Sequence, residues 1–178
     1  MGIRDEEIKR IKKYAEGLGI KVNFKKHRKG VGGAEWDMED RQITIYISPR
    51  TNKTTIILYL LHELGHHLDW IYHNKKDSKE AAKAYELLNS GPMFGDRSDI
   101  PEKYRQIIYR EEAAGIHYMS IIWKELDLKI PLWKVKLQQE LDLCEYRRLA
   151  NEGKFNTIKE HKEYRKSIKD YYIDKYGK

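Results

Sequence analysis

The segment that most constrains this chain is a run of apolar residues leading directly into two histidines. All six residues from Ile56 to Leu61 are apolar, so a helix built from them would be apolar on every side. Such a helix is normally buried in the middle of a domain. The polar stretch from Arg50 to Lys53 precedes the run, so the sequence predicts a central buried helix that begins near Thr54.

His62 and His66 continue this helix and predict a metal site. Residues four apart on a helix lie on the same face, so both imidazoles can reach one cation. Glu63, the neighbour of His62, is placed to hold and deprotonate a water beside that cation. The pattern His-Glu-x-x-His is typical of zinc metalloproteases, and two histidines with a carboxylate favour zinc.

A catalytic zinc site needs a third protein ligand and an open fourth position. The best candidate is Glu112, because Ala113, Ala114 and Gly115 follow it and small residues let two helices approach closely. Glu111 and Asp69 remain as alternatives.

Other polar residues near the motif are candidates for supporting roles. Asp69 shares the face of the two histidines, so it could accept a hydrogen bond from a ligand imidazole or anchor a neighbouring basic side chain. Tyr109 and His117 are candidates for stabilising negative charge in a transition state, with helix packing as the alternative for both. His67 points away from the metal-facing side and is expected to be structural or solvated.

The rest of the chain predicts an α+β fold with an antiparallel sheet, followed by helices only. The strands around Asp40 are expected to form a hairpin, and a boundary is expected near Asp127 to Ile130. The predicted helices cover Arg4–Glu16, the segment from Thr54, Ser78–Leu88, Pro101–Glu125, Pro131–Ala150 and Thr157–Tyr172, and the predicted strands cover Ile20–Lys26, Ala34–Met38 and Gln42–Ser48.

Composition excludes several classes of protein. No apolar run approaches the roughly 20 residues that cross a bilayer, and the charged start of the chain lacks the apolar stretch of a secretory signal. The single cysteine, Cys144, excludes an intrachain disulfide and a cysteine-only zinc site. We therefore expect a cytoplasmic protein with no membrane partner.

The motif residues resemble those of a known family. His62-Glu63-Leu64-Gly65-His66, followed by Glu111-Glu112-Ala113-Ala114, resembles the ImmA/IrrE-type metallopeptidases, which are minimal, gluzincin-like zincins common in bacteria and phages. The resemblance implies a zincin-like fold, with a small antiparallel sheet packed on the motif helix, over residues 1–128. Residues 129–178 would form a helical extension packed on that domain, or part of one structural unit with it.

The resemblance also implies an activity. Zinc held by His62, His66 and Glu112, with Glu63 as general base, would hydrolyse a peptide bond in a protein partner, typically a transcriptional repressor. The alternative is a zinc-binding regulatory or nucleic-acid-binding protein with little hydrolysis. The net charge of +7, the basic segment from Lys25 to Lys29 and the Tyr- and Lys-rich C-terminal helix motivate that alternative, although charges of both signs are interspersed along the chain.

Overall fold

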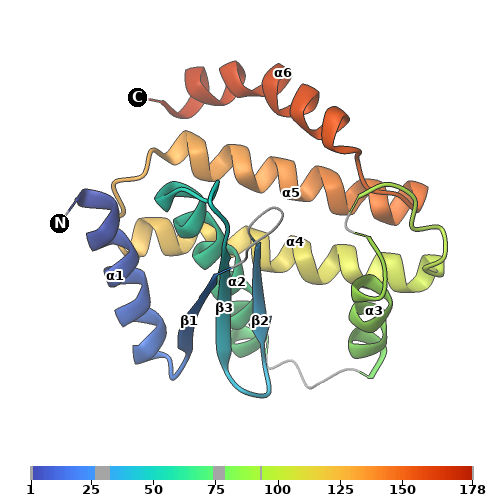
Figure 1. Cartoon of the computed structure of the whole chain (residues 1–178), viewed down its shortest axis with the longest axis horizontal. Coiled ribbons are helices and arrows are strands. Elements are labelled where there is room, and N and C mark those ends of the chain that lie inside the picture. Colours follow the sequence, from blue (N-terminus) through green and yellow to red (C-terminus); the bar gives the residue numbers. More distant parts are fainter. Residues whose placement is uncertain (1, 27–32, 74–78, 93, 178) are drawn as a thin grey trace.

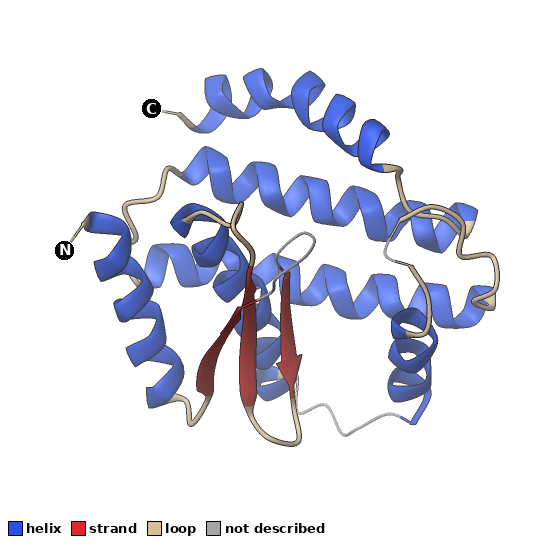
Figure 2. Ribbon diagram, in the orientation of Figure 1, coloured by secondary structure: helices blue, strands red, loops and turns tan. Residues whose placement is uncertain are grey.

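The computed structural model describes residues 2–26, 33–73, 79–92 and 94–177. Within these ranges the protein is α+β and mostly helical, as the sequence predicts (Figures 1 and 2). Ser78, where a helix is predicted to begin, and most of the basic segment from Lys25 to Lys29 lie outside the described residues. In chain order the elements are α1 (Ile3–Gly17), β1 (Lys21–Lys26), β2 (Gly33–Asp37), β3 (Gln42–Ile47), α2 (Lys53–Tyr72), α3 (Lys79–Asn89), α4 (Glu102–Glu125), α5 (Leu132–Glu152) and α6 (Ile158–Tyr176).

The sheet is mixed, so the prediction of an antiparallel sheet is only partly right. Its strand order is β1-β3-β2: the predicted hairpin joins β2 and β3, whereas β1 pairs with β3 in parallel. The most apolar strand, with Ile43 and Ile45 fully buried, takes the centre. The chain reverses direction between β1 and β2 and again before β3, so β1 and β3 run the same way. With β3 in the middle they become parallel neighbours.

Helix α2 is the buried central helix that the apolar run predicts. It begins at Lys53, where the side chain of Asn52 accepts a hydrogen bond from the backbone nitrogen of Thr55 at 3.0 Å and so caps a free N–H group. Ile57, Leu60, Leu61 and Leu64 are completely buried. They belong to a core that also includes α1, the sheet and α4, so α2 is packed from several sides.

The helices α4, α5 and α6 lie side by side, with α5 between the other two (Figure 1). The core continues across the predicted boundary at residue 128, because Leu128, Ile130 and Val135 belong to the same cluster as α2. The buried carboxylate of Glu7 on α1 accepts a hydrogen bond from the backbone nitrogen of Ile130 at 2.6 Å. The segment from 129 onward therefore packs directly on the N-terminal elements.

Helix α6 is attached differently, because none of its described residues is buried. Polar contacts hold it against α5: the hydroxyl of Tyr164 donates to Glu140 at 3.1 Å, and Nδ1 of His161 lies 2.7 Å from a carboxylate oxygen of Glu145. No helix within the described ranges is long and apolar enough to span a membrane.

Candidate metal centre

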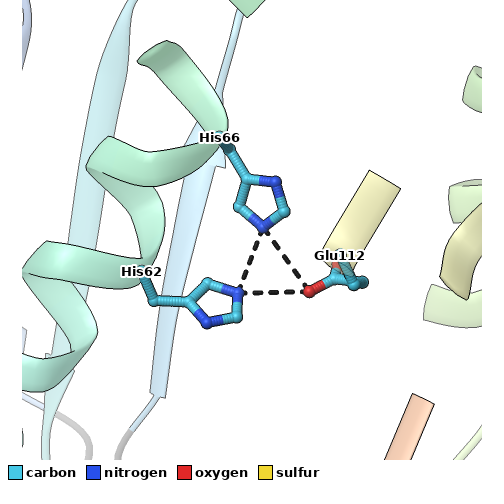
Figure 3. A group of neighbouring side chains, drawn as sticks. All are labelled: His62, His66 and Glu112. Carbon is cyan, nitrogen blue, oxygen red and sulfur yellow. Dashed lines mark hydrogen bonds and ion pairs between the residues drawn. The ribbon is translucent and has the colours of Figure 1, made fainter. Parts of the chain in front are cut away.

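Two histidines from α2 and one glutamate from α4 meet in a compact group (Figure 3). Nε2 of His62 lies 3.1 Å from both Nε2 of His66 and Oε2 of Glu112, and Nε2 of His66 lies 3.5 Å from the same oxygen. The three side chains point toward one another and are close enough to bind a single metal ion. Of the candidate third ligands in the sequence, the structure brings Glu112 to the histidines.

A close approach of α2 and α4 makes this meeting possible. A Cβ atom on Gly65 would lie 2.1 Å from the backbone oxygen of Gly115, and one on Gly115 would lie 2.6 Å from Nδ1 of His66. Both distances are shorter than real Cβ contacts allow, so a larger residue at either position would push the helices apart. The small residues that suggested a close helix contact in the sequence therefore provide it.

The second carboxylate oxygen of Glu112, Oε1, is also fixed by a hydrogen bond. Glu112 is 4% exposed, and its Oε1 accepts a hydrogen bond of 2.8 Å from the hydroxyl of Tyr85 on α3. Burial, and then the charge of Glu112, raise the pKa of Tyr146 on α5. Two tyrosines from different helices thus surround this carboxylate and leave Oε2 facing the histidines.

A second carboxylate, from α5, faces the opposite nitrogen of a histidine. Oδ2 of Asp142 lies 3.4 Å from Nδ1 of His62. An acceptor at Nδ1 favours the tautomer with the proton on that nitrogen, which leaves Nε2 unprotonated and able to bind a metal ion.

The carboxylate of Asp69 pairs with a histidine that is not one of the metal-binding residues. Its Oδ1 lies 2.7 Å from Nδ1 of His73, one turn further along α2. This contact fits the second of the two roles that the sequence suggests for Asp69, the anchoring of a neighbouring basic side chain. Asp142 is in the position that the first role would require.

The electrostatics of the group favour positive charge. Burial opposes the protonation of His62, but hydrogen bonds to Asp142 and Glu112 outweigh it and raise its pKa well above the ordinary value. Burial also acts to raise the pKa of Glu112, but the charge of His66 and hydrogen bonds with His62 and His66 prevail and lower it. Burial raises the pKa of Glu63 in spite of the two histidines. With three carboxylates around two imidazoles, a bound cation would be stabilised.

The two candidates for transition-state stabilisation lie in other contacts. The hydroxyl of Tyr109 hydrogen-bonds with Arg147 on α5, and this contact raises the pKa of that guanidinium. His117 is exposed, and its ring lies edge-on to that of Tyr118 at 5.6 Å. The structure therefore brings neither residue into the group of three metal-binding side chains.

His67 is structural rather than solvated. It is 1% exposed, and its ring packs edge-on against Trp36 of β2, with centroids 4.9 Å apart. Neither ring nitrogen has a hydrogen-bond partner among the described residues. Burial first, and then the charge of Arg41, lower the pKa of His67 to about 4, so the ring is neutral at physiological pH.

Sequence reasoning missed three residues around the metal-binding group: Tyr85, Asp142 and Tyr146. They reach it from α3 and α5, which are far from the motif along the chain. Tyr85 and Asp142 stand in ordinary amphipathic helices, where a tyrosine or an aspartate has no distinctive local signal. Only the packing of these helices on α2 and α4 reveals their part in the site.

A groove with a volume of about 1440 Å³ lies beside the metal-binding group, although His62, His66 and Glu112 are not among the residues that line it. Its walls come from the edge strand β2, the first turns of α2, and the helices α5 and α6. Asp142 and Tyr146 line the groove, and they are the residues that interact with His62 and Glu112. The space is larger than the roughly 300–1000 Å³ of typical small-molecule pockets.

Comparisons with known proteins found no family model, no curated protein and no solved structure that matches this chain. The resemblance to the ImmA/IrrE-type peptidases therefore depends on the motif residues alone.

Proposed function

We propose that this protein is a zinc-dependent peptidase whose metal is held by His62, His66 and Glu112. The observation that carries the proposal is the spacing of the three donor atoms, 3.1 to 3.5 Å from one another. Ligand atoms at about 2.0–2.1 Å from a tetrahedral zinc ion lie about 3.3–3.4 Å apart. The donor set fits zinc with little rearrangement.

The chemistry of the donors supports a catalytic rather than a purely structural site. Three protein ligands leave a fourth position open, whereas structural zinc sites are closed by four. Zinc bound here would act as a Lewis acid toward a water molecule and a peptide carbonyl. The side chains of His62 and His66 are 14% and 16% exposed, which leaves a path to that position.

Glu63 is the proposed general base. It follows a ligand histidine, is 9% exposed, and lies close enough to His62, His66 and Glu112 for each to influence its pKa. Burial raises that pKa toward the operating pH, which suits a group that accepts a proton from the attacking water and returns it to the leaving amine.

The edge strand β2 offers a place for the substrate backbone. It pairs with β3 on one side, and Gly33, Ala34 and Glu35 line the groove. An extended peptide can add a strand to such an edge and gain backbone hydrogen bonds. The groove would then direct the peptide past Asp142 toward the metal ligands. By family resemblance, the substrate would be a repressor-like regulatory protein.

The substitution Glu63→Gln tests the proposal. We expect the variant to keep one zinc ion per chain, because Glu63 is not a ligand, and to lose cleavage of a mixture of fluorescence-quenched peptides. The exposed residue Glu16 supplies a matched control, since Glu16→Gln makes the same chemical change on α1 and should preserve both properties. Full cleavage by the Glu63→Gln variant would exclude Glu63 as the base.

A further inference from the structure

The groove beside the metal-binding group contains charges that the proposed chemistry does not use. Its three acidic residues are all engaged: Glu35 hydrogen-bonds with the hydroxyl of Tyr46, Asp142 faces His62, and Glu145 accepts hydrogen bonds from Asn156 and His161. Among the basic residues, Lys53 is paired with Asp5 at 2.7 Å. Each of these charged groups therefore already has a polar partner within the protein.

Four other cations line the groove without such a partner: Arg50, Lys134, Arg165 and Lys169. Within the described ranges of the chain, none of them has a carboxylate at ion-pair distance. Arg165 and Lys169 are exposed and follow His161 at intervals of four residues, so the three share the face of α6 that borders the groove. The uncompensated charge of the groove is therefore positive.

Polar contacts fix the orientation of this basic face. His161 and Asn156 bind Glu145 of α5 through contacts of 2.7 to 2.9 Å, and the capping box between Thr157 and Glu160 fixes the first turn of α6. Because the helix is anchored at its beginning, Arg165 and Lys169 are presented to the groove in a defined position.

We propose that this groove binds an acidic segment of a polypeptide, so that the proposed peptidase selects substrates with Glu or Asp near the cleaved bond. The inference rests on the proposed function. Charges in a groove raise the local concentration of an oppositely charged partner and fix its register. The four cations come from the turn before α2, from α5 and from α6, and each would pair with a carboxylate of the substrate.

A polypeptide suits the groove better than a nucleic acid does. Among the described strands β2 pairs only with β3, so its other edge can take up a peptide backbone, and Tyr59, Phe94 and Trp133, which are partly or well exposed, provide apolar surface for side chains between the acidic ones. A nucleic acid would bring a phosphate at every nucleotide, and some of these would meet Asp142 or Glu35. An acidic peptide can instead place neutral residues opposite those carboxylates.

Binding to labelled peptides tests the inference. The protein is the full-length Glu63→Gln variant loaded with zinc, and the probes are fluorescent peptides of equal length in which alanine alternates with glutamate or with lysine. We expect tighter binding of the glutamate peptide, weakened by salt. The double substitution Arg165→Glu/Lys169→Glu should reduce that affinity about tenfold.

The same helix provides the matched control. Lys162 and Lys166 are exposed on α6 but do not line the groove, so Lys162→Glu/Lys166→Glu changes the net charge equally. This control should change the affinity less than about twofold. Equal losses in both double variants, or no preference for the glutamate peptide, would overturn the inference. The inference would also be overturned if a labelled single-stranded DNA bound more tightly than the glutamate peptide and this binding depended on Arg165 and Lys169. The groove would then be a nucleic-acid site.

Cleavage by the unmodified protein separates this inference from the proposed function. If quenched peptides with and without glutamate are cleaved equally well, the protein is a peptidase but the acidic preference is wrong. If no peptide is cleaved although the glutamate peptide binds through Arg165 and Lys169, the groove assignment holds and the peptidase proposal fails.

Discussion

At the scale of single residues, the site depends on positions where there is no room for a larger side chain. Gly115 is the clearest case, because a Cβ atom there would overlap the imidazole of His66. The histidine would have to turn away or α4 would have to move, and either change separates the donor atoms.

We therefore predict that Gly115→Ala lowers zinc affinity and costs about 1–3 kcal/mol of folding free energy. Gly17→Ala is the control, since a Cβ atom on that helical glycine meets nothing within 4 Å. Metal titration in competition with a chelator, together with thermal unfolding, measures both effects. Wild-type zinc affinity in Gly115→Ala would contradict the close contact between α2 and α4.

Oδ2 of Asp142 faces Nδ1 of His62, where a carboxylate would orient that imidazole for metal binding. Without a carboxylate at Nδ1, the imidazole is free to rotate and to adopt the wrong tautomer. We expect Asp142→Ala to weaken zinc binding about 10–100-fold while the fold is retained, as for other partners of metal ligands. Chelator competition measures the zinc affinity, and circular dichroism shows whether the fold is retained. An unchanged zinc affinity would show that Asp142 does not orient His62.

At the scale of helices and strands, the sequence best predicts features whose residues all lie within one element. The apolar run, the two histidines and Glu63 all lie within α2, so their relative positions follow from helix periodicity. Glu112 could be proposed because small residues follow it. The parallel pairing of β1 with β3 and the contacts of Asp142 and Tyr85 could not be predicted, because they depend on which distant elements pack together.

The docking of α6 gives a pH-dependent prediction. Burial acts to raise the pKa of Glu145, but hydrogen bonds from His161 and Asn156 outweigh it and lower that pKa. A carboxyl with a lowered folded-state pKa stabilises the protein above its ordinary pKa of 4.5, and this contribution is lost as the pH falls below that value.

Glu145→Gln should therefore cost about 1–3 kcal/mol near neutral pH, and the difference from wild type should shrink as the pH falls below 4.5. Denaturant unfolding measured between neutral and acidic pH gives this difference directly. A difference that stays constant with pH would mean that the charge of Glu145 does not hold α6.

At the scale of the whole molecule, one hydrophobic core joins residues 1–128 to the helical segment 129–178, the two parts between which the sequence predicts a boundary. Val135 of α5 packs in the same cluster as α2, and Asp142 reaches the metal ligands from the same helix. We predict that residues 1–128 expressed alone do not fold stably, and that the full chain unfolds in a single transition. Calorimetry tests both statements, and a cooperative transition for the truncated chain would contradict them.

The central claim is that three side chains from two helices hold one zinc ion. Elemental analysis of the purified protein tests it most directly, alongside the adjacent variants Glu112→Ala and Glu111→Ala. We expect about one zinc per chain in the wild type and in Glu111→Ala, and none in Glu112→Ala, because Oε2 of Glu112 completes the donor set. A protein that takes up no zinc, or that keeps it in Glu112→Ala, would contradict this assignment.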